Sequence, residues 1–259
     1  KVYRSGISYL WSNAFRYFCF IDIFKAIIFY FFMADKQDQY LKELNIFCWE
    51  NGFNPEPTRT ERLAYFAQLV VERNKKINLI SKRDIDSIVE KHIFISAYIS
   101  KYLPDKVSKF LDIGTGGGFP GIPLAIMRPD IRGVLVDSTL KKVEAVKDFI
   151  DKLKLSNVIA ENHRVESEEF ISRHGNSFDL IVSRATVPLI ILFRYAIPLI
   201  KEKSFLFAMK GGDLSEEFSK AELKYKSFIK KSTVYDLHYK PTNIRNQKGK
   251  KLVLIELQK

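Results

Sequence analysis

Residues 110–121 read FLDIGTGGGFPG, and this stretch decides the fold class. An apolar run that ends at Ile113 leads into a turn dense in glycine, and residues 123–127 after it have helical character. Glycine allows positive φ angles and lets a ligand approach the main chain closely. A strand, a glycine loop and a helix in this order predict a nucleotide-binding unit of an α/β fold.

The position of an acid separates two kinds of glycine loop. The dinucleotide fingerprint reads G-x-G-x-x-G and holds a pyrophosphate at the N-terminus of its helix. Here the pattern is D-x-G-x-G-x-G, with Asp112 two residues before the first glycine and Gly116 as the second. A carboxylate is unfavourable beside pyrophosphate, but it suits S-adenosylmethionine, which carries an ammonium and a sulfonium group.

A second acid agrees with this interpretation. Asp137 ends the next apolar run, 19 residues after Gly118. An acid at this position can accept hydrogen bonds from both ribose hydroxyls of an adenosine. Asp112, Gly116 and Asp137 are therefore predicted to bind an adenosine-bearing cofactor. The alternative is a tight turn with an ordinary helix cap.

From residue 109 onward, short apolar runs alternate with helical segments. Strands are predicted at 110–113, 134–136, 158–159, 180–183 and 205–208, and helices at 140–153 and 188–200. This alternation indicates a mostly parallel sheet flanked by helices. The β-rich runs 233–237 and 252–257 predict an antiparallel pair at the C-terminal edge of that sheet.

Three helices are predicted before the first strand. The first spans residues 35–50, the second begins at Thr60 and closes at residues 74–76, and the third is capped by Asp84 and reaches residue 103. The predicted organisation is therefore a helical N-terminal cap at residues 33–107 and a cofactor-binding domain at residues 108–259.

Residues 1–32 differ from the rest because they are crowded with aromatic side chains. A membrane anchor needs about 20 mainly apolar residues, whereas the run at 17–32 is shorter and contains Asp22 and Lys25. A signal peptide requires small residues at its cleavage site, and the sequence before Met33 lacks them. The interpretation favoured over an interfacial anchor is translated upstream sequence, with the native protein starting at Met33.

The chain of 259 residues is basic, with 42 Lys and Arg residues against 30 Asp and Glu residues and a formal net charge of +12. Such charge favours a polyanionic partner; the alternative is a basic protein without one. Cys19 and Cys48 form no C-x-x-C pair, and the four histidines show no metal-ligand spacing. We therefore expect no disulfide, no metal, no stable membrane association and a reducing, cytoplasmic setting.

The run GTGGGFPGIPLA at 114–125, with Asp137-Ser138 and Lys141-Lys142 after it, resembles the RsmG (GidB) family of bacterial 16S rRNA guanine-N7 methyltransferases. Flanking segments agree, namely KINLIS at 76–81, HI at 92–93, RVE at 164–166, SRA at 183–185 and KG at 210–211. The resemblance extends from about residue 39 to the C-terminus. Residues 1–32 have no counterpart in the family, and the tail at 240–245 follows its pattern only loosely.

This resemblance implies a Rossmann-like class I methyltransferase fold with S-adenosylmethionine as the cofactor. By position in the family motifs, Gly114 and Phe119 line the cofactor pocket. Val165 and Glu166 flank the adenine, and Arg184 lies near the face of methyl transfer. The implied substrate is 16S rRNA or the small ribosomal subunit, and a monomeric enzyme is expected.

No catalytic residue is predicted, because the sequence contains no Ser-His-Asp set, paired-carboxylate motif or metal-binding motif. Guanine N7 carries a lone pair and no proton, so its methylation needs no general base, only orientation of the reacting atoms. Three alternatives are a NAD-dependent oxidoreductase, a methyltransferase acting on a small molecule or protein, and a non-catalytic RNA-binding module. Asp112 weighs against the first, the basic charge against the second, and the intact glycine loop with Asp137 against the third.

Overall fold

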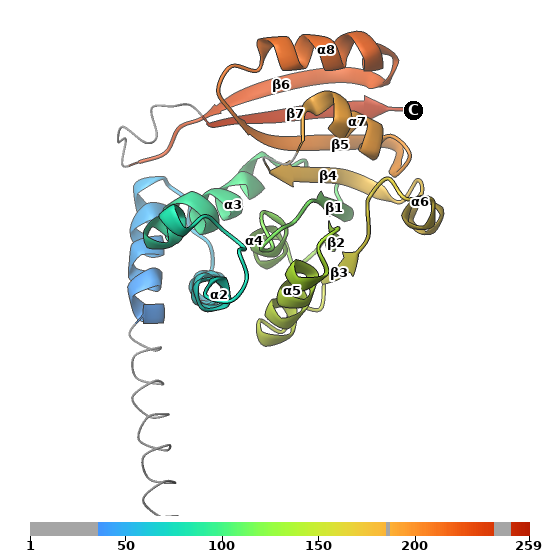
Figure 1. The fold of residues 1–259 in the computed structure, drawn as a ribbon. Helices are drawn as coiled ribbons and strands as arrows, with labels where there is room; N and C mark the ends of the chain where they lie inside the picture. Colours follow the sequence, from blue (N-terminus) through green and yellow to red (C-terminus); the bar gives the residue numbers. More distant parts are fainter. Residues whose placement is uncertain (1–35, 185–186, 241–249) are drawn as a thin grey trace, which may run out of the picture.

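The computed structural model describes residues 36–184, 187–240 and 250–259. Within them one seven-stranded sheet has the order β3-β2-β1-β4-β5-β7-β6, and Figure 1 shows it from β3 at the bottom to β6 at the top. The strands are β1 (Lys109–Ile113), β2 (Arg132–Asp137), β3 (Val158–Asn162), β4 (Phe178–Arg184), β5 (Ile200–Gly211), β6 (Ile229–Leu237) and β7 (Lys250–Gln258). The predictions for residues 1–32 lie outside the described residues.

Pairing within the sheet confirms the predicted fold class. Strands β1 to β5 are parallel, whereas β7 runs antiparallel to both β5 and β6. The chain leaves β1 toward β2 on one side and returns to β4 on the other, so the strand order reverses at β1. In open α/β sheets this reversal opens a crevice at the carboxyl ends of the strands, where ligands bind.

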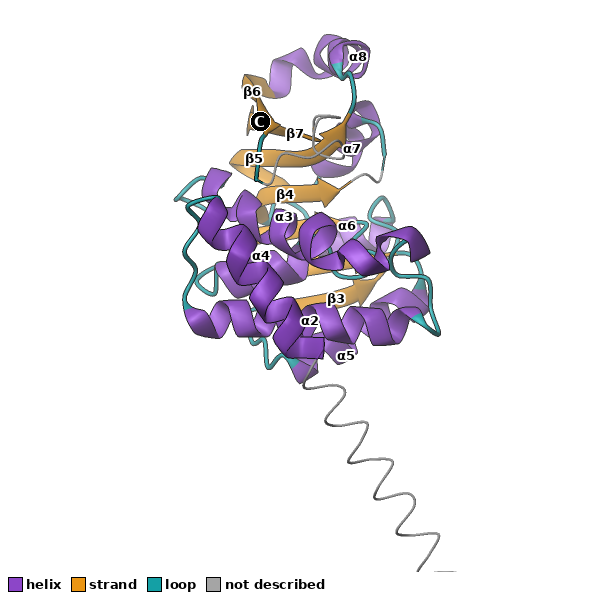
Figure 2. Cartoon of the chain, turned by 90° about the vertical axis from the view of Figure 1, so that its left-hand side faces the viewer, coloured by secondary structure: helices purple, strands orange, loops and turns teal. Residues whose placement is uncertain are grey.

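Helices cover both faces of the sheet. They are a helix at residues 36–50, α2 (Pro57–Asn74), α3 (Ile95–Tyr98), α4 (Gly121–Met127), α5 (Leu140–Lys152), α6 (Glu168–His174), α7 (Leu189–Ala196) and α8 (Ser215–Tyr225). The N-terminal helices share one apolar core with α4, α5 and one face of the sheet, and Figure 2 shows them in front of the strands. Helices α6, α7 and α8 pack on the other face. None of the helices in the described ranges has the length and apolar character needed to cross a bilayer.

The largest errors in the predicted boundaries of regular helices are at the start of α2 and the end of α7, and proline explains both. Helix α2 begins at Pro57 rather than at Thr60, because proline fits the first turn, where its missing N–H needs no partner. Helix α7 ends at Ala196 rather than at residue 200. Pro198 follows closely and has no N–H to donate to the carbonyl of Arg194, so the helical hydrogen-bond series ends there.

The third predicted helix is broken into turns of different pitch, and Asp84 does not cap it. A 3₁₀ turn (Lys82–Ser87) is followed by a π turn (Val89–Phe94), then by α3 and another 3₁₀ turn (Ile99–Tyr102). The cap is Ser81, whose hydroxyl accepts a hydrogen bond from the Arg83 N–H. Single π turns often accompany functional sites, and this one carries His92, described below.

Candidate active site

The glycine loop turns the chain sharply at the end of β1. Gly114 has a φ of 72°, which a side chain would disfavour, and its N–H donates to the Val136 carbonyl of β2 at 2.9 Å. Gly121 starts α4 so close to the sheet that an added Cβ would lie 2.6 Å from Asp112 Oδ2. The loop is therefore held tightly against β1 and β2.

Asp112 is fully buried beneath this loop. Its Oδ2 accepts hydrogen bonds from the Thr115 hydroxyl at 2.7 Å and from the Gly121 N–H at 2.9 Å. Burial raises the pKa of the carboxyl to about 7. Its Oδ1 is buried with no hydrogen-bond partner among the described residues, so the loop retains acceptor capacity for a cationic ligand.

Asp137 joins the glycine loop to α5. Its Oδ2 accepts a hydrogen bond from the Gly116 N–H at 3.0 Å, and its Oδ1 accepts one from the Thr139 N–H at 2.9 Å. Each carboxylate oxygen has two lone pairs, so both can still accept from a ligand hydroxyl. Gly116 and Asp137, two of the three residues predicted from the acid-and-glycine pattern, are thus in direct contact.

A hollow of about 220 Å³ opens at the carboxyl ends of β1 and β2. It is lined by Ile113, Gly114, Val136, Asp137, Ser138, His163, Arg164, Val165, Glu166, Val187 and Tyr195. The structure therefore brings together four of the predicted site residues, Gly114, Asp137, Val165 and Glu166. Apolar walls with a few acidic groups suit a planar base and its attached hydroxyls.

Arg184 ends β4 and lies on the cap side of the glycine loop. Its Nη2 donates to the Lys91 carbonyl at 2.9 Å and to His92 Nδ1 at 3.0 Å, and its Nη1 donates to Ser96 Oγ at 3.3 Å. Burial lowers the pKa of the guanidinium to about 10, so the group is still charged at neutral pH. All three acceptors belong to the turns that replaced the predicted helix.

Phe119 lies beside Arg184 and does not line the hollow. The guanidinium carbon is 5.8 Å from the centre of the Phe119 ring, and the rings of Phe66 and His92 lie 5.0 and 5.2 Å from it. The predicted site residues thus form two groups. Asp112, Phe119 and Arg184 contact the cap side of the loop, whereas Gly114, Asp137, Val165 and Glu166 line the open hollow. Gly116 donates its N–H to Asp137.

His92, which the sequence marks only as part of the flanking segment at 92–93, is in contact with Arg184. Its Nδ1 accepts from Arg184, and its Nε2 lies 3.2 Å from Asp84 Oδ2. Asp84 also pairs with the Lys91 ammonium. Burial and the neighbouring Arg184 charge lower the pKa of His92 to about 4, so the neutral imidazole connects the arginine to Asp84.

The sequence model of the family described as rRNA small subunit methyltransferase G matches residues 59–246. The chain belongs to this family. The methyltransferase G relative from Chlorobium luteolum is 40% identical over 190 residues, which are 73% of this chain and 78% of the relative. The relative from Flavobacterium johnsoniae is 43% identical over 151 residues, which are 56% of this chain and 69% of the relative.

Solved structures with low sequence identity agree on the fold of this methyltransferase G family member. An O-methyltransferase from Bacillus cereus in complex with SAH aligns with a TM-score of 0.51 at 14% identity, over 76% of this chain and 90% of that chain. TYW2 from M. jannaschii in complex with AdoMet aligns with a TM-score of 0.52 at 11% identity, over 71% and 80% of the two chains. Among the residues described, no group of His, Cys, Asp and Glu is arranged to hold a metal ion.

The stability of this methyltransferase G family member should fall on acidification because of His92. The ordinary pKa of about 6.5 in the unfolded chain drops to about 4 in the fold. The unfolded state therefore binds more protons between these values, so stability is full above pH 6.5 and is lost as the pH falls toward 4. The expected loss from this residue is about 3 kcal/mol.

Urea unfolding at pH 7, 5.5 and 4.5 measures this effect. His92→Gln should flatten the decline relative to the unsubstituted chain, whereas His238→Gln, at an exposed position, should leave it unchanged. Equal slopes for His92→Gln and the unsubstituted chain would show that the neutral imidazole does not account for the acid sensitivity.

Proposed function

We propose that the protein transfers a methyl group from S-adenosylmethionine to N7 of a guanine in 16S rRNA. The observation that carries this proposal is the hollow beside the glycine loop, lined by Asp137 and Glu166 in a chain of the methyltransferase G family. The names of the relatives support the substrate, since they are ribosomal RNA small subunit methyltransferases.

The residues of the hollow fit the parts of this cofactor. Asp137 would accept hydrogen bonds from the ribose hydroxyls, and Val165 with Glu166 would contact the adenine. Gly114 leaves the backbone accessible. The Asp112 carboxyl beneath the loop, with its unpaired Oδ1, would lie on the side of the amino and sulfonium groups, whose positive charge would favour its ionised form. When bound, the cofactor supplies an electrophilic methyl group.

The protein's own contribution is orientation and rigidity. Guanine N7 loses no proton on methylation, so the absence of a predicted general base agrees with the chemistry. Arg184 connects β4 to the cap through hydrogen bonds and contacts Phe119 of the glycine loop. These contacts hold the cap and the loop in place at the carboxyl edge of the sheet. Correct placement of reacting atoms can contribute about 7–11 kcal/mol to lowering a barrier.

We further infer that the target guanine is unpaired or extruded, since side chains cannot read the deep major groove of A-form RNA. The partner is 16S rRNA or the small ribosomal subunit, the enzyme acts as a monomer, and the site of action is the cytoplasm. The division into a cap at 33–107 and a catalytic domain at 108–259 also stays a proposal. The two parts share one apolar core, in which Phe66 of α2 packs on Phe119 and Phe149.

Asp137→Ala should raise the Kd for S-adenosylmethionine by about 10- to 100-fold. The substitution removes the ribose acceptor and also leaves the Gly116 and Thr139 N–H groups without their acceptor, each worth about 1 kcal/mol or more. Isothermal titration calorimetry measures the change. Asp151→Ala, an exposed acid in α5, the helix that follows Asp137, should bind as the unsubstituted chain does; equal affinity in both variants would contradict the assigned role.

A labelling assay tests the proposed function. The protein is incubated with S-adenosylmethionine carrying a labelled methyl group and, separately, with small subunits, bare 16S rRNA and tRNA from cells that lack this modification. Label in 16S rRNA or in the subunit is expected. Cofactor binding without labelled RNA would overturn the rRNA assignment and favour a small-molecule or protein substrate.

A further inference from the structure

A second hollow, of about 280 Å³, lies between α2 and α5. Four cations and two acids surround an apolar floor, and the lining consists of Leu69, Glu72, Arg73, Lys75, Lys76, Asp148, Phe149 and Lys152. Leu69 and Phe149, which form the floor, are 5% and 1% exposed. None of these residues lines the cofactor hollow, so the two hollows are separate.

The cations of this hollow are not fully neutralised. Lys152 pairs with Asp148 at 2.8 Å, which leaves Glu72 as the acid for the three cations at the end of α2. The Nε of Arg73 is buried without a hydrogen-bond partner within the described residues, as is Glu72 Oε1. A buried guanidinium N–H without an acceptor is unfavourable, and an anion entering the hollow would supply oxygen acceptors.

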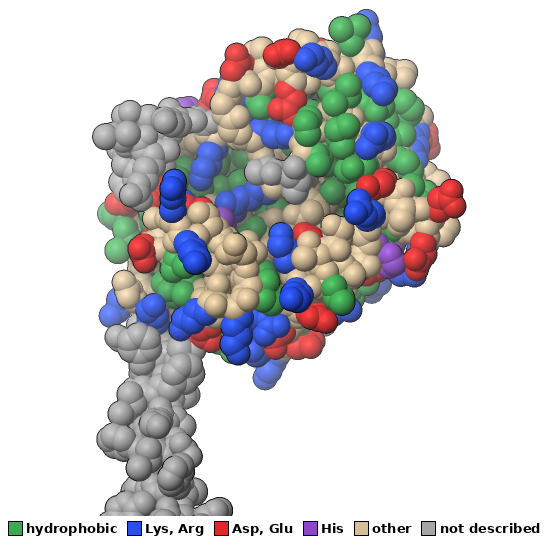
Figure 3. Space-filling view, in the orientation of Figure 1, with side chains coloured by type: hydrophobic (Ala, Val, Ile, Leu, Met, Phe, Trp, Pro, Cys, Tyr) green, Lys and Arg blue, Asp and Glu red, His purple; other side chains and the backbone are tan. Residues whose placement is uncertain are grey.

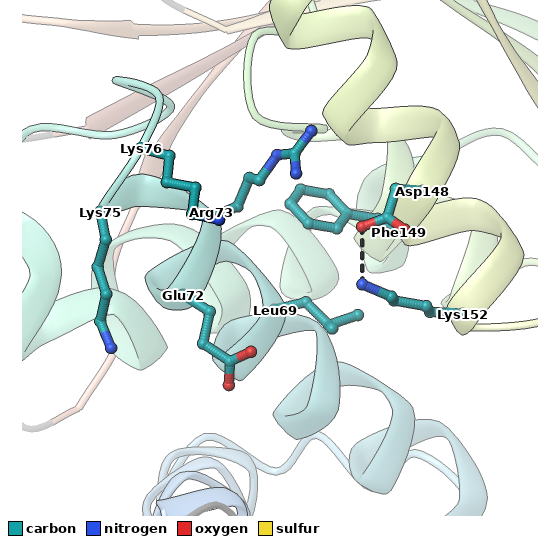
Figure 4. A pocket seen from close by; sticks show the side chains of 8 residues that line it. All are labelled: Leu69, Glu72, Arg73, Lys75, Lys76, Asp148, Phe149 and Lys152. Carbon is teal, nitrogen blue, oxygen red and sulfur yellow. Dashed lines mark hydrogen bonds and ion pairs between the residues drawn. The ribbon is translucent and has the colours of Figure 1, made fainter.

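Figure 4 shows how the side chains are arranged. Arg73 extends from the end of α2 toward α5, and Lys76 comes from the turn that follows α2. Lys152 approaches from α5, with the dashed line marking its ion pair with Asp148. In Figure 3, Lys and Arg side chains gather along the lower edge of the molecule, where Figure 1 places α2 and α5.

Hydrogen bonds and close packing connect the hollow between α2 and α5 to the glycine loop of the cofactor site. Asn74, the last residue of α2, accepts hydrogen bonds through Oδ1 from the N–H groups of Leu79 at 2.8 Å and Ile80 at 3.0 Å. Leu79 in turn contacts the glycine loop, since a Cβ on Gly117 would lie 3.1 Å from Leu79 Cβ. Helix α5 starts next to the cofactor hollow, and its 13 residues place Lys152 about 18 Å from that start.

We propose that the hollow between α2 and α5 binds backbone phosphates of the rRNA strand near the target guanine. Lys and Arg are the usual phosphate ligands in such interfaces, and phosphate contacts set the register of the nucleic acid. A distance of about 18 Å corresponds to a few nucleotides along a strand. The inference rests on the proposed function for the identity of the RNA, but binding can be measured without methyl transfer.

The test replaces three converging cations. The variant Arg73→Gln, Lys76→Gln, Lys152→Gln is compared with Lys203→Gln, Lys224→Gln, Lys226→Gln, which removes three exposed cations. Lys203 pairs with the end of β7 and Lys226 precedes β6, so these control residues lie near the sheet edge opposite the glycine loop. Both variants lose the same net charge.

At 150 mM salt, the Kd for 16S rRNA transcribed in vitro should be about tenfold higher for the triple variant of the hollow than for the unsubstituted chain. For the same variant, the slope of log Kd against log salt should fall by about 2. The control variant should change the Kd less than threefold, and both should bind S-adenosylmethionine as before. A double variant, Lys76→Gln with Lys152→Gln, keeps Arg73 and should weaken binding about fivefold if the triple variant is unstable.

If the triple variant of the hollow and the control variant weaken RNA binding equally, the effect is general charge attraction and the proposed phosphate site is overturned. An unsubstituted chain that fails to bind 16S rRNA would overturn it as well. If the unsubstituted chain binds this RNA without methylating it, the proposed function fails, whereas the comparison of the variants still decides whether the hollow binds phosphate.

Discussion

Arg184→Ala should lower kcat/KM for methyl transfer to 16S rRNA by about 1000-fold, an effect of the size seen when a preorganised polar group is lost from an active site. The guanidinium reaches the Lys91 carbonyl, His92 and Ser96 at once and lies against Phe119. Its removal leaves these acceptors buried and unpaired, and it loosens the cap from the glycine loop. Single-turnover kinetics with saturating cofactor measure the chemical step.

A second substitution distinguishes the effect of the Arg184 charge from that of its hydrogen-bonding geometry. Arg184→Lys keeps the charge but cannot reach three acceptors with one ammonium, so we expect a loss of about 100-fold. Arg132→Lys, at an exposed position at the start of β2, is the matched control and should have full activity. If Arg184→Ala keeps an activity within a few-fold of that of the unsubstituted chain, Arg184 is not part of the active site.

Gly121→Ala should destabilise the fold by about 2–3 kcal/mol and weaken cofactor binding. The added Cβ would lie 2.6 Å from Asp112 Oδ2 and 2.7 Å from Leu135 Cγ. Neither neighbour can move freely, because Asp112 is held by Thr115 and Leu135 belongs to β2. The glycine loop must therefore shift away from the sheet.

Thermal unfolding with and without S-adenosylmethionine measures both effects. A fall of Tm by about 5–10 °C is expected for Gly121→Ala, together with a smaller stabilisation by the cofactor. Gly211→Ala is the matched control, since nothing lies within 4 Å of its added Cβ and its φ is ordinary. Identical Tm values for the two variants would contradict the close packing of the loop on β1 and β2.

The order and type of the strands could be predicted from the sequence because the strands contain short apolar runs that are bounded by glycine-rich or polar segments. The starts of β5 and β6, at Ile200 and Ile229, were missed because polar residues follow them before the predicted runs begin. The contact of Asp137 with Gly116 likewise follows from local pattern, since both residues follow neighbouring strands. The broken helix at residues 82–102 could not be predicted. Its apolar residues keep helical spacing, and the turns are associated with tertiary contacts of His92 and Lys91 with Asp84 and Arg184.

The sequence pattern also could not predict that the site residues divide into two groups on opposite faces of the sheet. In a strand, alternate side chains point to opposite faces, so Asp112 lies on the cap side while Ile113 packs on the other face and lines the hollow. His163 and Tyr195 were missed because no motif marks them. Tyr195 reaches the hollow from α7, a helix whose position depends on the whole sheet.

The most direct test of the central claim locates the methyl group. Small subunits from cells that lack the modification are treated with the protein and S-adenosylmethionine, and their 16S rRNA is then cleaved by borohydride and aniline, which act at N7-methylguanine. Primer extension should detect one new stop, at a single guanine, that is absent without cofactor and absent with Arg184→Ala. Incorporation of label at another atom or another base, with no new cleavage, would contradict guanine N7 as the target.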